Sequence, residues 1–230
     1  MSIETMRHCQ VSDSKLSRFG SLAFFLMPVC YLGMFIIFGA LLAIPQGPDI
    51  NERIMYVMAE QDLIGIAYLL GYFIFGFLLL VAVQAIHNKL SGVSRHLLNS
   101  ASLFGFIWVV LMMCAGMIAL VGMNTMIAMY AKDPQAAAIL FYSYTMVVNA
   151  LGGGIELVGG MWVLLLSIVG LRSPIFSRSL CVVGLFVGVF GALTVFPSLP
   201  FMKEAFGLTQ IVWFVWVGTV LCRNKEINYE

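Results

Sequence analysis

Charged residues are scarce in this sequence, and their scarcity argues against most water-soluble folds. Asp, Glu, Lys and Arg make up 10% of the 230 residues, whereas an ordinary globular domain contains about 25%. Hydrophobic residues make up 61%, and the mean hydropathy is +1.00. Because so little polar surface is available, lipid must be the solvent for much of the chain. A net charge of +1 without any basic run also argues against binding to nucleic acid.

The sequence also lacks the motifs of metal centres, disulfide frameworks and common hydrolases. No CxxC pair, HExxH, GxSxG or phosphate-binding glycine loop is present. No histidine lies at metal-ligand spacing from any of the five cysteines, which are Cys9, Cys30, Cys114, Cys181 and Cys222. We therefore expect no disulfide, no metal and no other cofactor, and an enzymatic function is the least favoured.

A signal-peptide cleavage site is missing as well. The apolar stretch from Phe19 to Ile44 follows a polar, basic segment, 1–18. It is longer than the roughly 7–15 residues of a signal h-region, so it is expected to be retained as a membrane span. Continuous apolar runs predict helices rather than barrel strands. The sequence predicts a single all-α bundle over 1–230 with six transmembrane helices, at approximately 19–44, 63–86, 97–122, 147–171, 179–196 and 205–222.

The distribution of Lys and Arg predicts the orientation of these spans. With the N-terminus inside, only three of the 12 basic residues fall in outer segments, namely Arg53, Lys132 and Lys203. The positive-inside rule then places the segment 1–18 and the tail 223–230 in the cytoplasm, which fits an even number of spans.

Two outer connections have helical features of their own. Asp49 and Glu52 form a possible capping box, and an amphipathic helix follows it with apolar positions at Ile50, Ile54, Val57 and Met58. We expect this helix to lie on the outer surface as a connector, with binding of a partner as the alternative. Asp133-Pro134 predicts a helix start, and the preceding helix should continue to about Tyr130. Together they predict an extended outer helical hairpin.

Glu156 is the only charged residue inside the six predicted spans. If its span begins near Val147, it lies about nine residues, or roughly 13 Å, below the surface. Carboxylates at such depth usually face the bundle interior and have a partner or a role.

The neighbours of Glu156 allow two interpretations. On a continuous helix, Glu156 would share a face with glycines on either side and with Asn149 two turns earlier; the glycines concerned are Gly152, Gly153, Gly159 and Gly160. Such a face permits close approach of another helix. Alternatively, the run Gly152, Gly153 and Gly154 unwinds the helix and exposes backbone groups to a ligand. In a purely structural role, a protonated Glu156 would hydrogen-bond Asn124, Gln84 or Gln210.

Two further patterns have weaker functional implications. Gly184, Gly188 and Gly191 predict a close helix contact, which is expected within the chain rather than with a second copy. His87 and His96 flank a basic cytoplasmic loop. Haem ligation would need paired histidines at membrane depth, so we expect this loop to lie near anionic headgroups instead.

The C-terminal part of the sequence resembles a known group of membrane proteins. The stretches concerned are Gly159-Gly-Met-Trp-Val-Leu-Leu-Leu-Ser167, Leu171-Arg172-Ser173, Gly184-Leu-Phe-Val-Gly-Val-Phe-Gly191 and Gln210-Ile-Val-Trp-Phe-Val-Trp-Val-Gly218. They resemble bacterial multi-pass proteins of domain of unknown function 4386, over about the last 75 residues. The resemblance implies a helical protein of the bacterial inner membrane and implies no catalytic residues.

Three functional hypotheses follow from these patterns. The first is transport of a small solute or ion, with Glu156 as a proton- or cation-responsive carboxylate. The second is a non-catalytic scaffold or accessory subunit that acts through helix contacts, as a homo-oligomer or with a membrane-protein partner. The third is an enzyme that modifies a lipid or quinone. In each case the lipid bilayer is the expected environment.

Overall fold

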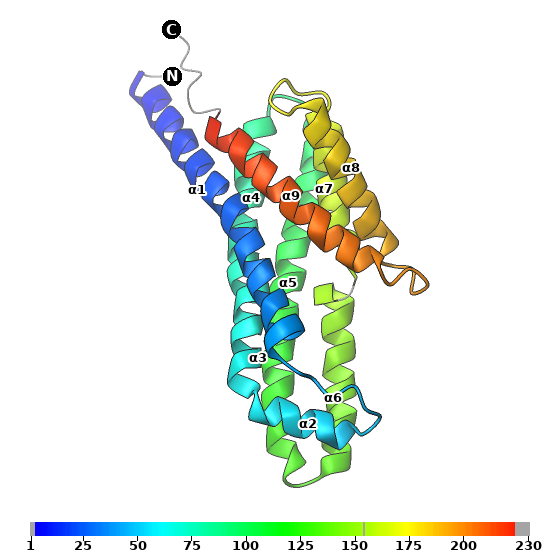
Figure 1. Ribbon diagram of the computed structural model, residues 1–230. Helices are drawn as coiled ribbons and strands as arrows, with labels where there is room; N and C mark the ends of the chain where they lie inside the picture. Colours follow the sequence, from blue (N-terminus) through cyan, green and yellow to red (C-terminus); the bar gives the residue numbers. More distant parts are fainter. Residues whose placement is uncertain (1–2, 154, 224–230) are drawn as a thin grey trace. The chain divides into compact units, whose positions relative to one another are not determined.

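The computed structural model describes residues 3–153 and 155–223, and all secondary structure in these ranges is helical (Figure 1). This confirms the predicted all-α class. π-helical turns extend or join the helices at Ile37–Leu41, Leu69–Ile74 and Asn149–Gly153. The helices are α1 (Ile3–Ile36), α2 (Ile50–Ala59), α3 (Gln61–Tyr68), α4 (Phe75–Leu90), α5 (Arg95–Tyr130), α6 (Pro134–Val148), α7 (Leu157–Gly170), α8 (Arg178–Leu193) and α9 (Met202–Arg223).

Within the described residues, five helical segments are long and apolar enough to cross a membrane. They are Lys15–Leu41, Gln61–Leu90, Arg95–Tyr130, Pro134–Gly170 and Met202–Arg223. The helix α8 has 16 residues, which correspond to about 24 Å, against roughly 30 Å for the hydrocarbon core. The predicted count of six spans is therefore not confirmed.

The predicted span 179–196 is too long because a proline follows it. The helix α8 ends at Leu193, and the next residues form turns, with the Phe196 N–H donating to the Leu193 carbonyl over 3.0 Å. Pro197 has no N–H and disfavours helical backbone in the residue before it. Val195 and Phe196 are apolar but lie after the last residue of the helix, so hydropathy alone overestimated its length.

The chain forms two compact units. The first unit consists of Met1–Pro28, Phe77–Val109 and Glu156–Glu230, and the second consists of Val29–Gly76 and Val110–Ile155. Each unit therefore combines segments that are distant in the sequence.

The core of the first unit is an aromatic cluster. Phe24 of α1 stacks on Trp162 of α7, with ring centroids 6.3 Å apart and an interplanar angle of 8°. Trp213 of α9 meets Trp162 edge to face at 5.8 Å and 78°. Trp108 and Phe214 complete the cluster, and all five side chains are buried. Offset-stacked and edge-to-face pairs are the favoured geometries of aromatic rings, so this cluster holds α1, α5, α7 and α9 together.

Glycines bring the helices of the first unit into backbone contact. A Cβ added at Gly160 of α7 would lie 2.8 Å from Gly191 Cα and 2.9 Å from the Gly188 carbonyl oxygen of α8. A Cβ added at Gly184 would collide with Ser167 Oγ of α7 and would lie 2.5 Å from Trp213 Nε1 of α9. The glycines predicted to seat a neighbouring helix therefore contact α7 and α9 of the same chain, as expected.

The second unit contains the predicted amphipathic helix and the predicted hairpin. Asp49 accepts a hydrogen bond from the Asn51 N–H at the start of α2, and Ile54 and Val57 are buried. The hairpin partner α6 begins after Asp133, whose carboxylate accepts from the Ala136 N–H. These observations confirm both helix starts.

Candidate functional site

The apolar segment Pro134–Gly170 is a broken helix. It runs as α6 to Val148, passes through the π-helical turn Asn149–Gly153, and resumes as α7 at Leu157 (Figure 1). At the break, Gly152 has a φ of 147°, a conformation that costs glycine little but strains residues with a Cβ. The glycine run therefore unwinds the helix, as the second interpretation of the sequence predicted.

The break corrects the predicted helical face around Glu156. Gly159 and Gly160 lie one turn after Glu156 on α7, as expected. Gly152 and Gly153 belong to the turn that precedes the break, so they do not share a helical face with Glu156. The prediction was wrong on this side because it assumed a continuous helix. Gly154 lies outside the described residues.

Glu156 is the N-cap residue of α7, and its side chain is buried, with 9% of its surface exposed. Its backbone carbonyl accepts a hydrogen bond from the Gly160 N–H at 2.8 Å. Its backbone N–H donates to Thr194 Oγ1 at 2.8 Å, and that hydroxyl donates to the Gly191 carbonyl at 2.7 Å. Thr194, the residue after α8, thus links the start of α7 to the end of α8.

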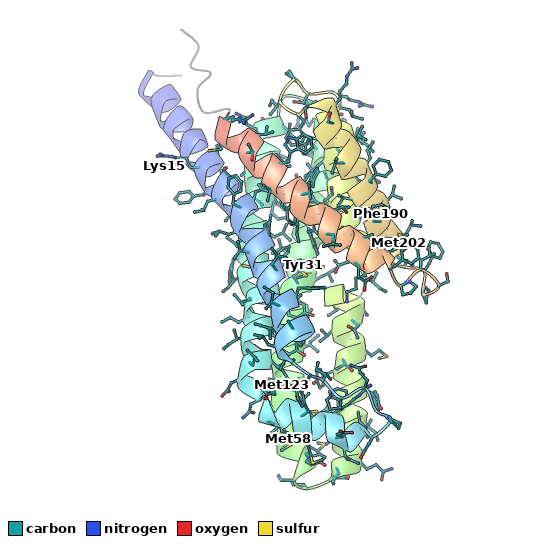
Figure 2. All side chains as sticks on the ribbon, viewed as in Figure 1. Lys15, Tyr31, Met58, Met123, Phe190 and Met202 are labelled. Atoms are coloured by element: carbon teal, nitrogen blue, oxygen red, sulfur yellow. The ribbon has the colours of Figure 1, made fainter. Side chains whose placement is uncertain are left out.

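Two positive charges act on the Glu156 carboxylate. One is the N-terminal end of α7, where unpaired N–H groups carry the positive end of the helix dipole. The other is Lys203, the second residue of α9, which interacts electrostatically with Glu156. Figure 2 shows Phe190, in the last turn of α8, and Met202, the first residue of α9, at this same end of the unit. The site therefore lies where α7 begins, α8 ends and α9 begins.

The other predicted site residues divide between the two units. Gln210 of α9 is buried in the first unit, with 3% of its surface exposed, and Gln84 of α4 is exposed in the same unit. Asn124 and Asn149 are exposed and belong to the second unit. Of the three amides predicted as partners of Glu156, only Gln210 shares its burial and its unit.

Two polar contacts of the first unit were not predicted. One is the Thr194 hydroxyl at the break, which lies 38 residues from Glu156 in the sequence. The other joins His87 of α4 to Ser102 of α5, with Nδ1 and Oγ 2.6 Å apart. Threonine beside a helix end and serine within an apolar helix are both common. The polarity of Thr194 and Ser102 was therefore the only feature of the sequence that could have indicated these contacts.

The described residues contain no group of three His, Cys, Asp or Glu side chains that could hold a metal ion. Cys30, Cys114, Cys181 and Cys222 are free thiols, and the side chain of Cys9 lies outside the described part of the structure. The chemistry available at the break is thus that of one carboxylate, one hydroxyl and one ammonium group.

No protein-family model, curated protein or solved structure matches the chain significantly.

Proposed function

We propose that this protein carries a small solute or an ion across the membrane, with Glu156 as the carboxylate that binds a proton or a cation. The observation that carries the proposal is the break in an apolar segment that leaves a buried carboxylate at the N-terminus of a half-helix. Discontinuous helices form the substrate and ion sites of many transporters, because their free backbone groups face the ligand.

The position of the break supports this role. It falls between the 15 residues of α6 and the 14 residues of α7, near the middle of a 37-residue apolar segment. A carboxylate within such a segment is costly unless it has a partner or a function. Lys203 and the α7 dipole offset its charge, and a proton or cation bound at Glu156 would weaken that interaction with Lys203.

For the membrane setting, we propose the bacterial inner membrane with both termini in the cytoplasm. The basic residues Arg172, Arg178 and Arg223 flank α7, α8 and α9 at the ends assigned to the cytoplasm. In this topology α8 is the fifth of six crossings, and its short length is accommodated by local thinning of the bilayer. The resemblance to domain of unknown function 4386 agrees with this setting and stays a prediction.

The test is proton flux into proteoliposomes that contain purified protein and an entrapped pH-sensitive dye. We expect an imposed pH gradient, alone or with an opposing sodium gradient, to dissipate faster than in protein-free vesicles. Glu156→Gln should abolish this difference, because the amide cannot exchange a proton. Glu204→Gln is the matched control, since Glu204 is an exposed acid in the first turn of α9.

The flux assay also separates this proposal from a structural role. Flux and melting temperature that are both unchanged in Glu156→Gln would remove any role for the carboxylate. Unchanged flux with a lowered melting temperature would leave Glu156 as a packing residue. A titrating carboxyl band in the infrared spectrum that disappears in Glu156→Gln would support proton access to the site.

A second candidate function is a non-catalytic scaffold. The observation in its favour is an exposed apolar face on α6, formed by Ile139, Tyr142 and Met146, within the predicted hairpin. This hypothesis predicts a protein that co-purifies with the chain and is lost when the region 123–146 is altered. If lipid alone covers this face, the same substitutions will leave the composition of the purified sample unchanged.

A further inference from the structure

A groove lies between α4 and α5 in the first unit, away from Glu156 in the sequence. Its volume is about 380 Å³, and it is lined by Gln84, His87, Asn99, Ser102, Leu103 and Phe106. Four of these side chains are polar, although they belong to two helices that are apolar enough to span a membrane. We propose that this groove binds the headgroup of an anionic phospholipid.

The residues that line the groove lie within the depth of one leaflet from the connection between the two helices. The two helices are joined by the short connection 91–94. His87 and Asn99 lie about one turn from this connection, whereas Phe106 lies about 16 Å along α5 from its first residue. One leaflet contributes half of a hydrocarbon core of roughly 30 Å. A headgroup at His87 and Asn99 would therefore have its acyl chains beside Leu103 and Phe106.

The polar residues are arranged to donate hydrogen bonds to a phosphate. The His87 ring is fixed through Nδ1, which lies 2.6 Å from Ser102 Oγ. In the tautomer that accepts the serine proton at Nδ1, the other ring nitrogen carries a proton that is available to a ligand. The amides of Gln84 and Asn99 are exposed and supply further donors. Polar groups at membrane depth are costly without a partner, and a headgroup would bond the second ring nitrogen of His87 and the two amides.

Charge selects an anionic headgroup over a neutral one. Arg95 lies one turn before Asn99 on the same face of α5, and Lys89 and His96 border the same connection. The sequence contains no Asp or Glu between Asp62 and Asp133, so no acid of these helices opposes the approach of an anion. Basic residues next to a span attract anionic lipid from the cytoplasmic leaflet.

The test is lipid retention by the full-length protein after delipidation in detergent. Phosphatidylglycerol or phosphatidylcholine with identical acyl chains is added back, and the lipid that remains bound after gel filtration is quantified together with the melting temperature. We expect phosphatidylglycerol to be retained and to raise the melting temperature, because a ligand of the folded state stabilises it. Phosphatidylcholine should do neither.

Variants locate the site on the protein. The double variant Arg95→Gln with Asn99→Leu should weaken retention of phosphatidylglycerol about tenfold or more. The loss of one hydrogen bond to a charged group typically lowers an affinity by about this factor. Both positions are exposed, so folding should be unaffected, and the melting temperature without lipid checks this. The matched control is Arg178→Gln with Asn124→Leu, which makes the same changes at exposed positions elsewhere.

Three results would overturn the proposal. Equal retention of the two lipids would exclude an anionic headgroup. An equal loss of retention in the control variant, or no loss in the Arg95 and Asn99 variant, would place the lipid elsewhere. A rise in melting temperature with inorganic phosphate alone, as large as that with phosphatidylglycerol, would show a simple anion site. The proposed role of Glu156 is independent of each result.

Discussion

Two apolar segments of nearly equal length behave differently in this structure. Arg95–Tyr130 has 36 residues and forms one continuous helix, α5, whereas Pro134–Gly170 has 37 residues and is broken between α6 and α7. Apolar length therefore does not decide between the two forms. The difference lies in how glycine is distributed and in what each glycine contacts.

In α5 the glycines are isolated, and each leaves room for a neighbouring side chain. A Cβ at Gly105 would collide with Val83 and Trp162, and one at Gly122 would collide with Tyr144. Helical residues on both sides of an isolated glycine maintain the backbone hydrogen bonds. Three consecutive glycines, 152–154, lack this support and pay the largest entropic penalty for remaining helical.

The backbone groups freed by the break find partners from elsewhere. The Ile155 N–H donates to the Asn149 carbonyl at 3.3 Å, and the Glu156 N–H donates to Thr194 Oγ1. Buried backbone groups are nearly always paired, so a break in a buried helix is stable only where such partners are present. The break is therefore supported by hydrogen bonds on the residues that follow it and is not a local failure of the helix.

The largest effect is expected from a substitution that forces α7 and α8 apart. Gly160→Val should lower the stability of the protein by about 3 kcal/mol or more, because the added carbons meet the backbone of α8 and cannot be accommodated by a side-chain movement. Thermal unfolding in detergent, followed by tryptophan fluorescence, would measure the loss.

The control for this substitution is Gly65→Val in α3, where no heavy atom of the described residues lies within 4 Å of the added Cβ. An equal loss of stability in both variants would mean that valine itself, rather than the contact with α8, is responsible.

A second test asks whether the break requires glycine. Gly152→Ala should destabilise the protein by about 1–3 kcal/mol, the usual cost of a residue with a Cβ in a rarely populated backbone conformation. Gly65→Ala, on a regular helix, should be neutral or stabilising by up to about 1 kcal/mol, since alanine favours helices over glycine. Chemical unfolding of both variants measures whether each substitution lowers or raises the free energy of unfolding. Stabilisation by Gly152→Ala would show that a continuous helix is the more stable form of this segment.

The smallest expected effect concerns the hydroxyl that links the break to α8. Thr194→Val keeps the shape of the side chain but leaves the Glu156 N–H without its acceptor, which should cost about 1 kcal/mol at a half-buried position. Thr219→Val is the matched control, because the Thr219 hydroxyl donates to Val215 of its own helix and is exposed. Indistinguishable melting temperatures for the two variants would argue against the link.

The sequence predicted most of the secondary structure correctly, for local physical reasons. Long apolar runs predicted helices, the Asp49 and Asp133 caps predicted where α2 and α6 begin, and the glycine run predicted a weak point beside Glu156. The end of α8 was misjudged because hydropathy continues to Phe196, whereas backbone chemistry stops the helix before Pro197.

The candidate site was only partly predictable. Glu156 was identified because a carboxylate in an apolar segment is conspicuous, but its surroundings depend on residues that are far away in the sequence. Gln84 and Asn124 were considered as partners for their polarity alone, and the structure places both at exposed positions. No local pattern indicates which helix ends will meet.

By itself, the sequence determined that the chain is helical and largely apolar, and that a single carboxylate interrupts its predicted spans. Composition and short-range periodicity are sufficient for this, because each helix satisfies its own backbone. The tertiary structure decided where the long segment breaks, that the Thr194 hydroxyl bonds the Glu156 N–H, and that α4 and α5 form a groove. These features depend on side chains that meet only after the helices have packed, and their positions follow from contacts across the whole chain.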